Sequence, residues 1–204
     1  MRANAGSPIA ATPSGAQLRL GSVFQPWVGN GGRTVQDVKR TDMNAEALLS
    51  QISQIVAKLG PRMERLQQVA AALRQSAGYH WVGLYDADAS RGEVRNLVWD
   101  GPGAPEYPTF PITKGLTSSA IAKNRTVNVG DVGADPRYLT ALGSTRSEII
   151  VPISNDQGEV VGTIDVESER SNAFDQSTER LLEDCAVLLR PLFAEPGHES
   201  NQEE

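Results

Sequence analysis

Two stretches of the chain show the apolar spacing of amphipathic helices, with apolar side chains recurring every three or four positions. Gly60 and Pro61 divide the first stretch into two helices, because glycine suits the end of a helix and proline its first turn. The second stretch, residues 175–193, predicts a last helix with Asp175 as its N-cap and with Pro191 kinking or fraying its end. The apolar positions of the first stretch are Leu48, Leu49, Ile52, Ile55, Val56 and Leu59, then Leu66, Val69 and Leu73.

Between these helices the pattern changes to short β-rich segments bounded by turn residues. The expected strands are residues 79–85, 94–99, 110–112, 127–129, 147–153 and 159–167. Short helices are expected between them, at 117–122 and 136–142. Helices, then a run of strands, then a helix predict an α+β fold, in which a central antiparallel sheet carries helices on one face.

This pattern predicts a single domain over residues 42–194, with N-terminal helices in 42–76, the sheet in 79–167 and the last helix in 175–193. Residues 1–41 are rich in Gly, Ala, Ser, Pro and Asn and show no sustained periodicity. Such a segment buries too little apolar surface to offset its ordering entropy, so we expect it to be disordered or loosely docked. Residues 195–204 form an acidic tail with four glutamates and no Lys or Arg.

Composition narrows the function classes. The net charge of −6 and the lack of a basic stripe argue against a nucleic-acid partner. A single cysteine excludes an internal disulfide and a multi-cysteine zinc site. The only histidines, His80 and His198, have no partner at metal-ligand spacing, so neither a metal nor another cofactor is expected. No apolar run reaches the roughly 20 residues of a membrane span, and the N-terminus lacks a secretory signal, so we expect a cytoplasmic protein without a membrane partner.

The first candidate for a binding surface is the strand at residues 81–85, which reads Trp-Val-Gly-Leu-Tyr. Strand alternation places Trp81, Gly83 and Tyr85 on one face and Val82 and Leu84 on the other. The second face is typical of a core. On the first face, the glycine leaves room for a small ligand between the two rings. The alternative is that both rings simply pack under a loop.

The second candidate is an acidic hairpin at residues 146–167. A four-residue loop at 155–158 pairs Ser154 with Glu159, and this register places Glu148 opposite Asp165 and Arg146 opposite Glu167. Two carboxylates directly opposed in a sheet destabilise it unless a cation, a shared proton or water lies between them. The ammonium group of a ligand would serve. The alternative is a pair of solvated carboxylates at the end of a sheet.

Over residues 45–193 the chain resembles GAF domains, and among them the free methionine-(R)-sulfoxide reductases. Residues 145–153 (Thr-Arg-Ser-Glu-Ile-Ile-Val-Pro-Ile) are similar to the Ser-Arg-Ser-Glu-Ile-Val-Val-Pro block of those enzymes. Residues 161–168 (Val-Gly-Thr-Ile-Asp-Val-Glu-Ser) are similar to their Gly-Val-Leu-Asp-Ile-Asp-Ser block, residues 81–85 to their Trp-x-Gly-Phe-Tyr strand, and Phe174 with Asp175 to their Phe-x-x-x-Asp. The resemblance implies a GAF fold with a ligand cavity on the free face of the sheet. It also implies pocket roles for Trp81, Tyr85, Glu148 and Asp165, and for Glu167, where the family has the shorter aspartate.

The resemblance also locates the three cysteines on which the chemistry of these reductases depends. Aligned through Lys114-Gly115 and Glu148, their positions hold Tyr107, Thr117 and Ala141 in this chain. A threonine hydroxyl cannot replace a thiol that forms a sulfenic acid and then a disulfide. The remaining cysteine, Cys185, lies on the apolar stripe of the last helix, which favours an inert buried thiol.

The sequence therefore predicts a non-catalytic GAF domain that binds a small, polar, amino-acid-like metabolite and acts as a sensor through a protein partner. A homodimer formed by the N-terminal and C-terminal helices is expected. Two alternatives stay open: an enzyme that uses the retained pocket, and a structural or protein-interaction GAF domain whose pocket is filled, with Tyr107 as the plug. The expected ligand-binding residues are Trp81, Tyr85, Tyr107, Thr117, Arg146, Glu148, Asp165 and Glu167.

Overall fold

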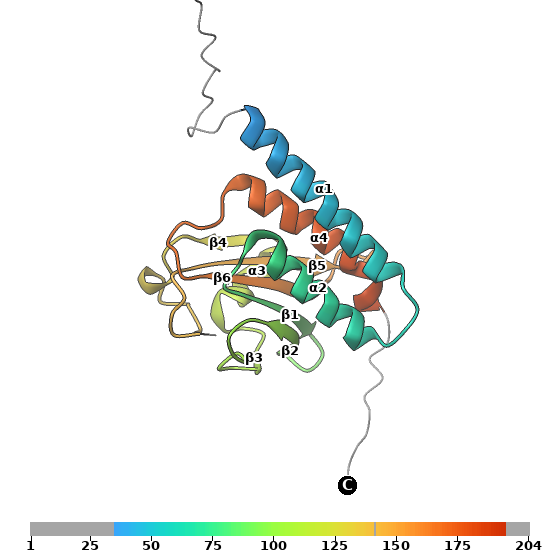
Figure 1. The fold of residues 1–204 in the computed structure, drawn as a ribbon. Coiled ribbons are helices and arrows are strands. Elements are labelled where there is room, and N and C mark those ends of the chain that lie inside the picture. The colour runs from blue at the N-terminus through green and yellow to red at the C-terminus, as the bar shows by residue number, and fades with distance from the viewer. Residues whose placement is uncertain (1–34, 141, 195–204) are drawn as a thin grey trace, which may run out of the picture. The chain divides into compact units, whose positions relative to one another are not determined.

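A single antiparallel sheet organises the chain (Figure 1). The computed structural model describes residues 35–140 and 142–194. Its strands are β1 (Trp81–Asp88), β2 (Glu93–Asp100), β3 (Thr109–Pro111), β4 (Val127–Val129), β5 (Ser147–Ser154) and β6 (Val160–Ser168), in the order β3-β2-β1-β6-β5-β4. Its helices are α1 (Val35–Ala57), α2 (Arg62–Ala77), α3 (Gly115–Lys123) and α4 (Gln176–Ala194), with a short 3-10 turn η1 (Val132–Ala134). The expected α+β architecture is confirmed.

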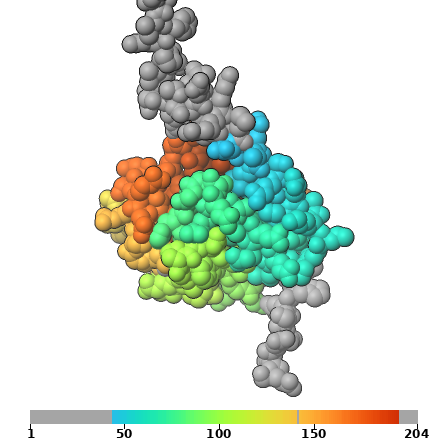
Figure 2. All heavy atoms as spheres, viewed as in Figure 1, coloured from blue at the N-terminus to red at the C-terminus, as the bar shows by residue number. Residues whose placement is uncertain are grey.

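Helices α1, α2 and α4 lie on one side of the sheet, and in space-filling view their atoms meet over much of that side (Figures 1 and 2). The apolar stripes predicted from the sequence point inward, and Ile52, Leu73 and Leu182 are fully buried there. The sheet contributes alternate residues to the same core, including Leu84 of β1 and Ile164 of β6. At about 25 cal/mol per Å² of buried apolar surface, this cluster is the main source of stability in the domain.

The ends of the helices follow local sequence signals. Gly78 ends α2 in the left-handed conformation (φ 64°), where its N–H bonds to the carbonyl of Arg74. Asp175 caps α4 as expected, since its carboxylate accepts a hydrogen bond from the backbone N–H of Thr178 at 2.9 Å. Pro191 does not end α4, which continues to Ala194. The Arg62 side chain donates a hydrogen bond to the carbonyl of Leu192 at 2.5 Å and so satisfies an acceptor that the helix end leaves free.

The opposite side of the sheet is covered by α3 and by the segments before and after it. Ile150 of β5 contacts Leu116 and Ala120 of α3, whereas its neighbours Ile149 and Val151 face the helix-side core. A second apolar cluster on this side centres on Trp81, Tyr85 and Phe110. Both faces of the sheet are therefore covered, one by long helices and the other by one short helix and loops.

The expected register of the β5–β6 hairpin is wrong by two residues. Asn155 already pairs with Glu159 through a 2.8 Å backbone hydrogen bond, which shortens the loop by one residue, and an irregularity at Ile153/Ser154 adds a second shift. Glu148 therefore lies opposite Glu167, not Asp165, and Arg146 is not paired with Glu167. A shift of two preserves the face to which each side chain points, because strand side chains alternate with a period of two.

Two other expectations need correction. The expected helix at 136–142 is a turn over the part that is described, because Asp135 accepts a hydrogen bond from the backbone N–H of Arg137 at 3.0 Å and pairs with its guanidinium at 2.6 Å. Local bonds of this kind compete with helix formation. Helix α1 begins at Val35, inside the segment 1–41 that was expected to lack order; residues 1–34 and the acidic tail lie outside the described residues. No helix in the described part of the chain is long and apolar enough to cross a membrane.

Candidate functional site

A small cavity lies against the sheet on the side of α3. It has a volume of about 20 Å³, which is room for about one water molecule. Strands β1, β5 and β6 form its floor, and α3 and two loops close it. The lining residues are Trp81, Tyr85, Tyr107, Phe110, Leu116, Thr117, Leu139, Thr140, Glu148, Asp165 and Glu167.

Three carboxylates dominate the floor of this cavity, and we call Glu148, Asp165 and Glu167 the acid cluster. Glu148 and Glu167 are directly opposed across β5 and β6, and Asp165 is two residues before Glu167 on the same face. Their exposed fractions are 6%, 4% and 0%, which is rare for acidic side chains without a cationic partner. None of the lining residues is Lys, Arg or His. The cluster is therefore a concentration of negative groups in a nearly dry space.

Hydroxyl groups satisfy only part of this cluster. Thr117 of α3 donates a hydrogen bond to Oδ2 of Asp165 at 3.4 Å, and Thr145 donates a short one to Oε2 of Glu167. The second oxygens, Asp165 Oδ1 and Glu167 Oε1, have no hydrogen-bond partner among the described residues. A buried acceptor without a donor costs roughly 1–3 kcal/mol. Among the described residues the one further hydroxyl that acts on Asp165 is that of Thr163, and its Oγ1 is itself buried without a hydrogen-bond partner. The acid cluster therefore has room for a stronger, cationic donor.

Burial shifts the acid cluster toward its protonated form. It raises the pKa of Asp165 from 3.8 to about 7, although the hydroxyl groups of Thr163 and Thr117 act in the opposite direction. Burial also raises the pKa of Glu167 from 4.5 to about 7, with the charge of Asp165 adding to the effect. The pKa of Glu148 is raised well above its ordinary value by burial and by the charges of Glu167 and Asp165. Like charges in a low-dielectric site cannot all ionise without a counter-charge.

Aromatic side chains form one wall beside the acid cluster. The ring centroids of Trp81 and Tyr85 are 6.3 Å apart, and those of Tyr85 and Phe110 are 5.9 Å apart. The first two rings close over Gly83, where an added Cβ would lie 2.3 Å from Trp81 and 2.9 Å from Tyr85. The hypothesis of a ligand lying between these two rings is therefore wrong, because they contact each other. Trp81 is held in place by a 3.0 Å hydrogen bond from its indole N–H to the carbonyl of Gly103.

The structure brings together seven of the eight predicted ligand-binding residues. Tyr107 lines the cavity mouth and is 42% exposed, and Thr117 lines its inner side and is 4% exposed. Arg146 is the exception, because it is exposed and does not line the cavity. Ala141, the third position aligned with a reductase cysteine, lies outside the described residues. Sequence reasoning missed Phe110, Leu116, Leu139 and Thr140, whose apolar or neutral side chains give no signal of a site.

The only thiol of the chain lies on the other side of the sheet. Cys185 of α4 is fully buried in the helix-side core. Burial, helped by the charge of Asp184, raises the pKa of its thiol to about 12. A thiol in that environment stays protonated and is a poor nucleophile. The expectation of an inert buried cysteine is supported, and no sulfur group lines the acid cavity.

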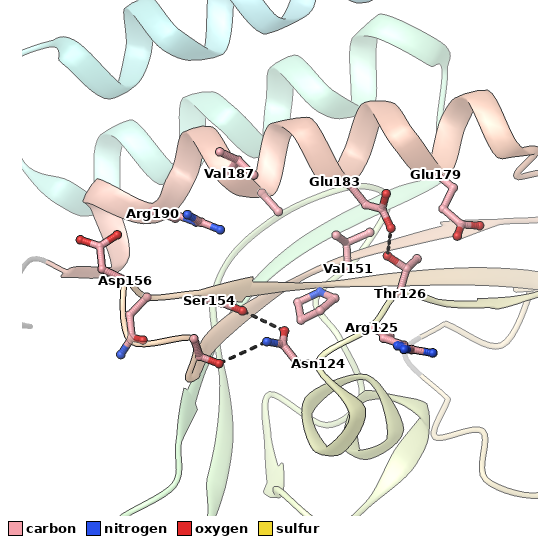
Figure 3. Close-up of a pocket in the computed structure, with 14 residues that line it drawn as sticks. Asn124, Arg125, Thr126, Val151, Ser154, Asp156, Glu179, Glu183, Val187 and Arg190 are labelled. Atoms are coloured by element: carbon pink, nitrogen blue, oxygen red, sulfur yellow. Dashed lines mark hydrogen bonds between the residues drawn. The ribbon is translucent and has the colours of Figure 1, made fainter.

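A larger hollow of about 670 Å³ lies at the sheet edge, between α4 and the end of β5 (Figure 3). Two pairs of its polar side chains are bonded to each other: Thr126 donates to Glu183 at 2.6 Å, and Ser154 donates to Asn124 at 2.8 Å. Arg125 and Arg190 line it but are exposed to solvent. Because its charged groups are solvated, nothing in this groove demands a ligand, whereas the small acid cavity contains buried acceptors without donors.

Comparison with known proteins places the chain in a family. The sequence pattern of GAF domains matches residues 61–190, a span that includes the whole sheet and the acid cluster. The chain belongs to the GAF domain family. It is 30% identical over 144 residues to GAF domain-containing protein A of Dictyostelium discoideum, which covers 71% of this chain and 89% of that protein.

Free methionine-R-sulfoxide reductases are also among its relatives. The Saccharomyces cerevisiae enzyme is 31% identical over 112 residues, which is 54% of this chain and 61% of that enzyme. The crystal structure of the Neisseria meningitidis enzyme with its substrate has a TM-score of 0.69 and 32% identity, over 76% of this chain and 90% of that one. The predicted GAF fold and the predicted relationship to these reductases are both confirmed.

Proposed function

We propose that this GAF domain binds a small, amino-acid-like metabolite through its acid cluster, without catalysing a reaction on it. The observation that carries the proposal is the pair of buried oxygens, Asp165 Oδ1 and Glu167 Oε1, that lack a hydrogen-bond donor. A ligand ammonium group brings three N–H donors and a positive charge. It would satisfy both oxygens and neutralise the negative site.

The aromatic wall supports an organic rather than an inorganic cation. Trp81, Tyr85 and Phe110 offer flat apolar surface beside the carboxylates, which suits the carbon chain of a ligand whose amino group faces the acids. No group of acidic, histidine or cysteine side chains in the described part of the chain has the arrangement of a metal site. Because the cavity of about 20 Å³ holds about one water molecule, a whole amino acid enters only if the covering segments move.

We propose that the domain has no reductase activity, because its thiol lies on the other side of the sheet from the acid cavity. The relatives include free methionine-R-sulfoxide reductases, and thiol-based reduction requires a reactive sulfur at the substrate. In this chain Cys185 is separated from the acid cavity by the sheet. Incubation with methionine-(R)-sulfoxide and dithiothreitol should therefore give no reduction above the buffer control. Turnover that Cys185→Ser abolishes would refute this part of the proposal.

A sensory role requires that occupancy be passed on, and we propose that the helix side does this in a homodimer and through a partner protein. Helices α1 and α4 border a surface groove of about 410 Å³, which is lined by Val56, Leu188, Pro191 and their neighbours. Val187, which also lines this groove, is 52% exposed. Sedimentation equilibrium of the wild type and of Val187→Asp tests this arrangement: the wild type should be a dimer and the variant a monomer.

Calorimetric titration tests the binding proposal directly. Methionine, both of its sulfoxide epimers and other amino acids are titrated into the wild type, Glu148→Gln, Asp165→Asn and the control Glu93→Gln. Glu93 is an exposed carboxylate on β2 that does not line the cavity. At least one amino acid should bind the wild type and Glu93→Gln alike, and should bind the two cluster variants at least about tenfold more weakly, a loss of about 1.4 kcal/mol. Equal affinity in all four proteins would exclude the acid cluster as the binding site.

The small volume of the cavity also favours a second candidate, a protein-interaction GAF domain with a filled pocket. Tyr107 lines the cavity and is 42% exposed, so its truncation opens the cavity to solvent. If Tyr107→Ala gains binding of an amino acid that the wild type lacks, the native pocket is filled and the second candidate is favoured. If the wild type binds and Tyr107→Ala binds no better, the first proposal holds.

A further inference from the structure

The acid cavity contains three ionisable carboxylates but no opposite charge. Glu148 comes from β5 and Asp165 and Glu167 come from β6, and all three are at least nine-tenths buried. Asp165 and Glu167 both line the closed space, and one oxygen of each is buried without a hydrogen-bond partner among the described residues. The protein must either keep protons on this cluster, admit a cation, or open the cavity to water.

No neighbouring element supplies the missing positive charge. Among the described lining residues, the other titratable groups are the phenols of Tyr85 on β1 and Tyr107 on the loop after β2. Helix α3 presents Thr117 and Leu116, and the loop before β5 presents Leu139, Thr140 and the Thr145 hydroxyl. The imidazole of His80, the one histidine among the described residues, bonds to Ser144 and lies 3.6 Å from Glu169, outside the cavity lining.

We propose that protons held on the acid cluster keep the pocket closed, and that their loss opens it. The inference rests on the proposed function, because an open pocket is the form that can take up a metabolite. In the closed form the three acids are neutral and can stay buried around a cavity that has room for about one water molecule. In the ionised form their mutual repulsion and their need for hydration favour a wetter, open cavity.

The cover that must move is the loop between β2 and β3. This loop carries Tyr107 over the cavity mouth, and it is fixed at one end by the hydrogen bond from Trp81 to the Gly103 carbonyl and at the other by a 2.7 Å bond from Asn96 N–H to the Pro108 carbonyl. The loop therefore opens when the bond between Trp81 and Gly103 breaks, while the bond between Asn96 and Pro108 keeps its other end attached. Trp81, which is fully buried under the loop, becomes accessible when it lifts.

The pH window follows from the direction of the shifts. Asp165 and Glu167 have pKa values of about 7 in the closed form, against ordinary values of 3.8 and 4.5. Protonation stabilises the closed form fully at a pH below the ordinary pKa values. This stabilisation decreases as the pH rises above them and is gone once the pH exceeds the closed-form pKa of about 7. Each pKa unit between the two forms changes the opening equilibrium by about tenfold. The pocket should therefore be closed at about pH 5 and open at about pH 8.

Acrylamide quenching of Trp81 fluorescence measures this opening without any ligand. The experiment uses the full chain with Trp27→Phe and Trp99→Phe, which leaves Trp81 as the only tryptophan. Acrylamide is uncharged, so its own access does not depend on pH. We expect the quenching constant, obtained from lifetimes, to rise with an opening equilibrium that shifts by roughly tenfold or more between about pH 5 and pH 8.

Neutral replacements identify the groups responsible. Adding Asp165→Asn and Glu167→Gln keeps the size of the side chains but leaves Glu148 as the only ionisable member of the acid cluster, so the quenching constant should lose most of its dependence on pH. Glu148→Gln alone should reduce the response and serves if the double variant does not fold, as judged by circular dichroism. Glu93→Gln should leave it unchanged. A response of undiminished size in the double variant, or the absence of a response from the background protein, overturns the proposal.

Infrared spectroscopy gives a second, independent readout. The carbonyl stretch of protonated carboxyl groups should be present in the folded protein near neutral pH and should be weaker in the double variant, which retains only Glu148 of the acid cluster. Its absence from the wild type would overturn the proposal. If either test fails, the proposal of ligand binding still stands or falls by the calorimetric titration, because that experiment does not depend on how the pocket opens.

Discussion

The two faces of strand β6 have opposite roles. Ile164 and Val166 point toward α1, α2 and α4 and are fully buried among apolar side chains. Asp165 and Glu167, the residues that alternate with them, point into the acid cavity and leave oxygens without donors. The side chains of the first face find all their contacts within the core, whereas the second face has buried hydrogen-bond acceptors without donors. The comparison teaches that the helix side supplies stability, while the unsatisfied side is where a ligand has something to gain.

The largest effect should come from a truncation on the helix side. Leu84 of β1 is fully buried in the helix-side core, one residue away from the cavity face. Leu84→Ala should lower the free energy of unfolding by about 3 kcal/mol, within the usual range for a buried leucine. Urea denaturation measures the loss. If the two faces have separate roles, affinity for a ligand of the acid cavity should change little under conditions where the variant is folded.

The next effect is a dependence of stability on pH that only the cavity side produces. Asp165 has a folded pKa of about 7 against 3.8 ordinarily, so its contribution is complete at low pH and is lost as the pH rises to about 7. Wild-type stability should fall by roughly 2 kcal/mol between about pH 5 and pH 8. Asp165→Asn should be flatter with pH and more stable than the wild type at the higher pH. Urea denaturation of both proteins over this pH range measures the free energy of unfolding. Identical pH profiles for the two proteins would contradict the assignment of the effect to Asp165.

A substitution at Gly83 tests how tightly the cavity side is packed. The added methyl group of Gly83→Ala would lie 2.3 Å from the Trp81 ring and 2.9 Å from the Tyr85 ring. Overpacking of this kind costs about 1–3 kcal/mol. The near-ultraviolet circular dichroism of the aromatic residues should change while the far-ultraviolet spectrum is retained. An unchanged aromatic signal would mean that the two rings do not close over this glycine.

The smallest effect concerns the hydroxyl that supports the acid cluster. Thr117→Val removes the 3.4 Å hydrogen bond to Asp165 and should cost about 1 kcal/mol. Because this bond favours the ionised form, its loss should raise the pKa of Asp165 further, as a carbon-detected NMR titration of the carboxyl group would show. Thr126→Val, which removes the exposed bond to Glu183, is the matched control and should leave that pKa unchanged.

The elements of the fold could be read from the sequence because they depend on local patterns. The spacing of Ile52, Leu73 and Leu182 predicts helices that bury one face, and the alternation around Gly83 predicts which side chains share a sheet face. The register of the β5–β6 hairpin could not be predicted, since it depends on a loop length and on an irregularity near Val161 that leave no mark in the pattern.

The candidate site was predictable to the extent that its residues are chemically distinctive. Acidic side chains on a sheet face, such as Asp165, attract attention in a sequence, and the two-residue error in register left them on the same face. The closure of Trp81 against Tyr85 was not predictable, because it depends on how rings fold over Gly83 in three dimensions. Arg146 was misplaced because its expected partner depended on the wrong register.

The central claim is that the unsatisfied face of the sheet binds a small amino-containing metabolite. Thermal unfolding against a panel of amino acids, their oxides and simple amines tests it most directly, with Glu148→Gln/Asp165→Asn and Glu93→Gln in parallel. A ligand at about a hundred times its Kd adds about 2.7 kcal/mol, which should raise the Tm by roughly 5–10 °C. We predict such a shift for the wild type and Glu93→Gln, and none for the double variant. A panel without any shift, or a shift that the double variant retains, would contradict the account.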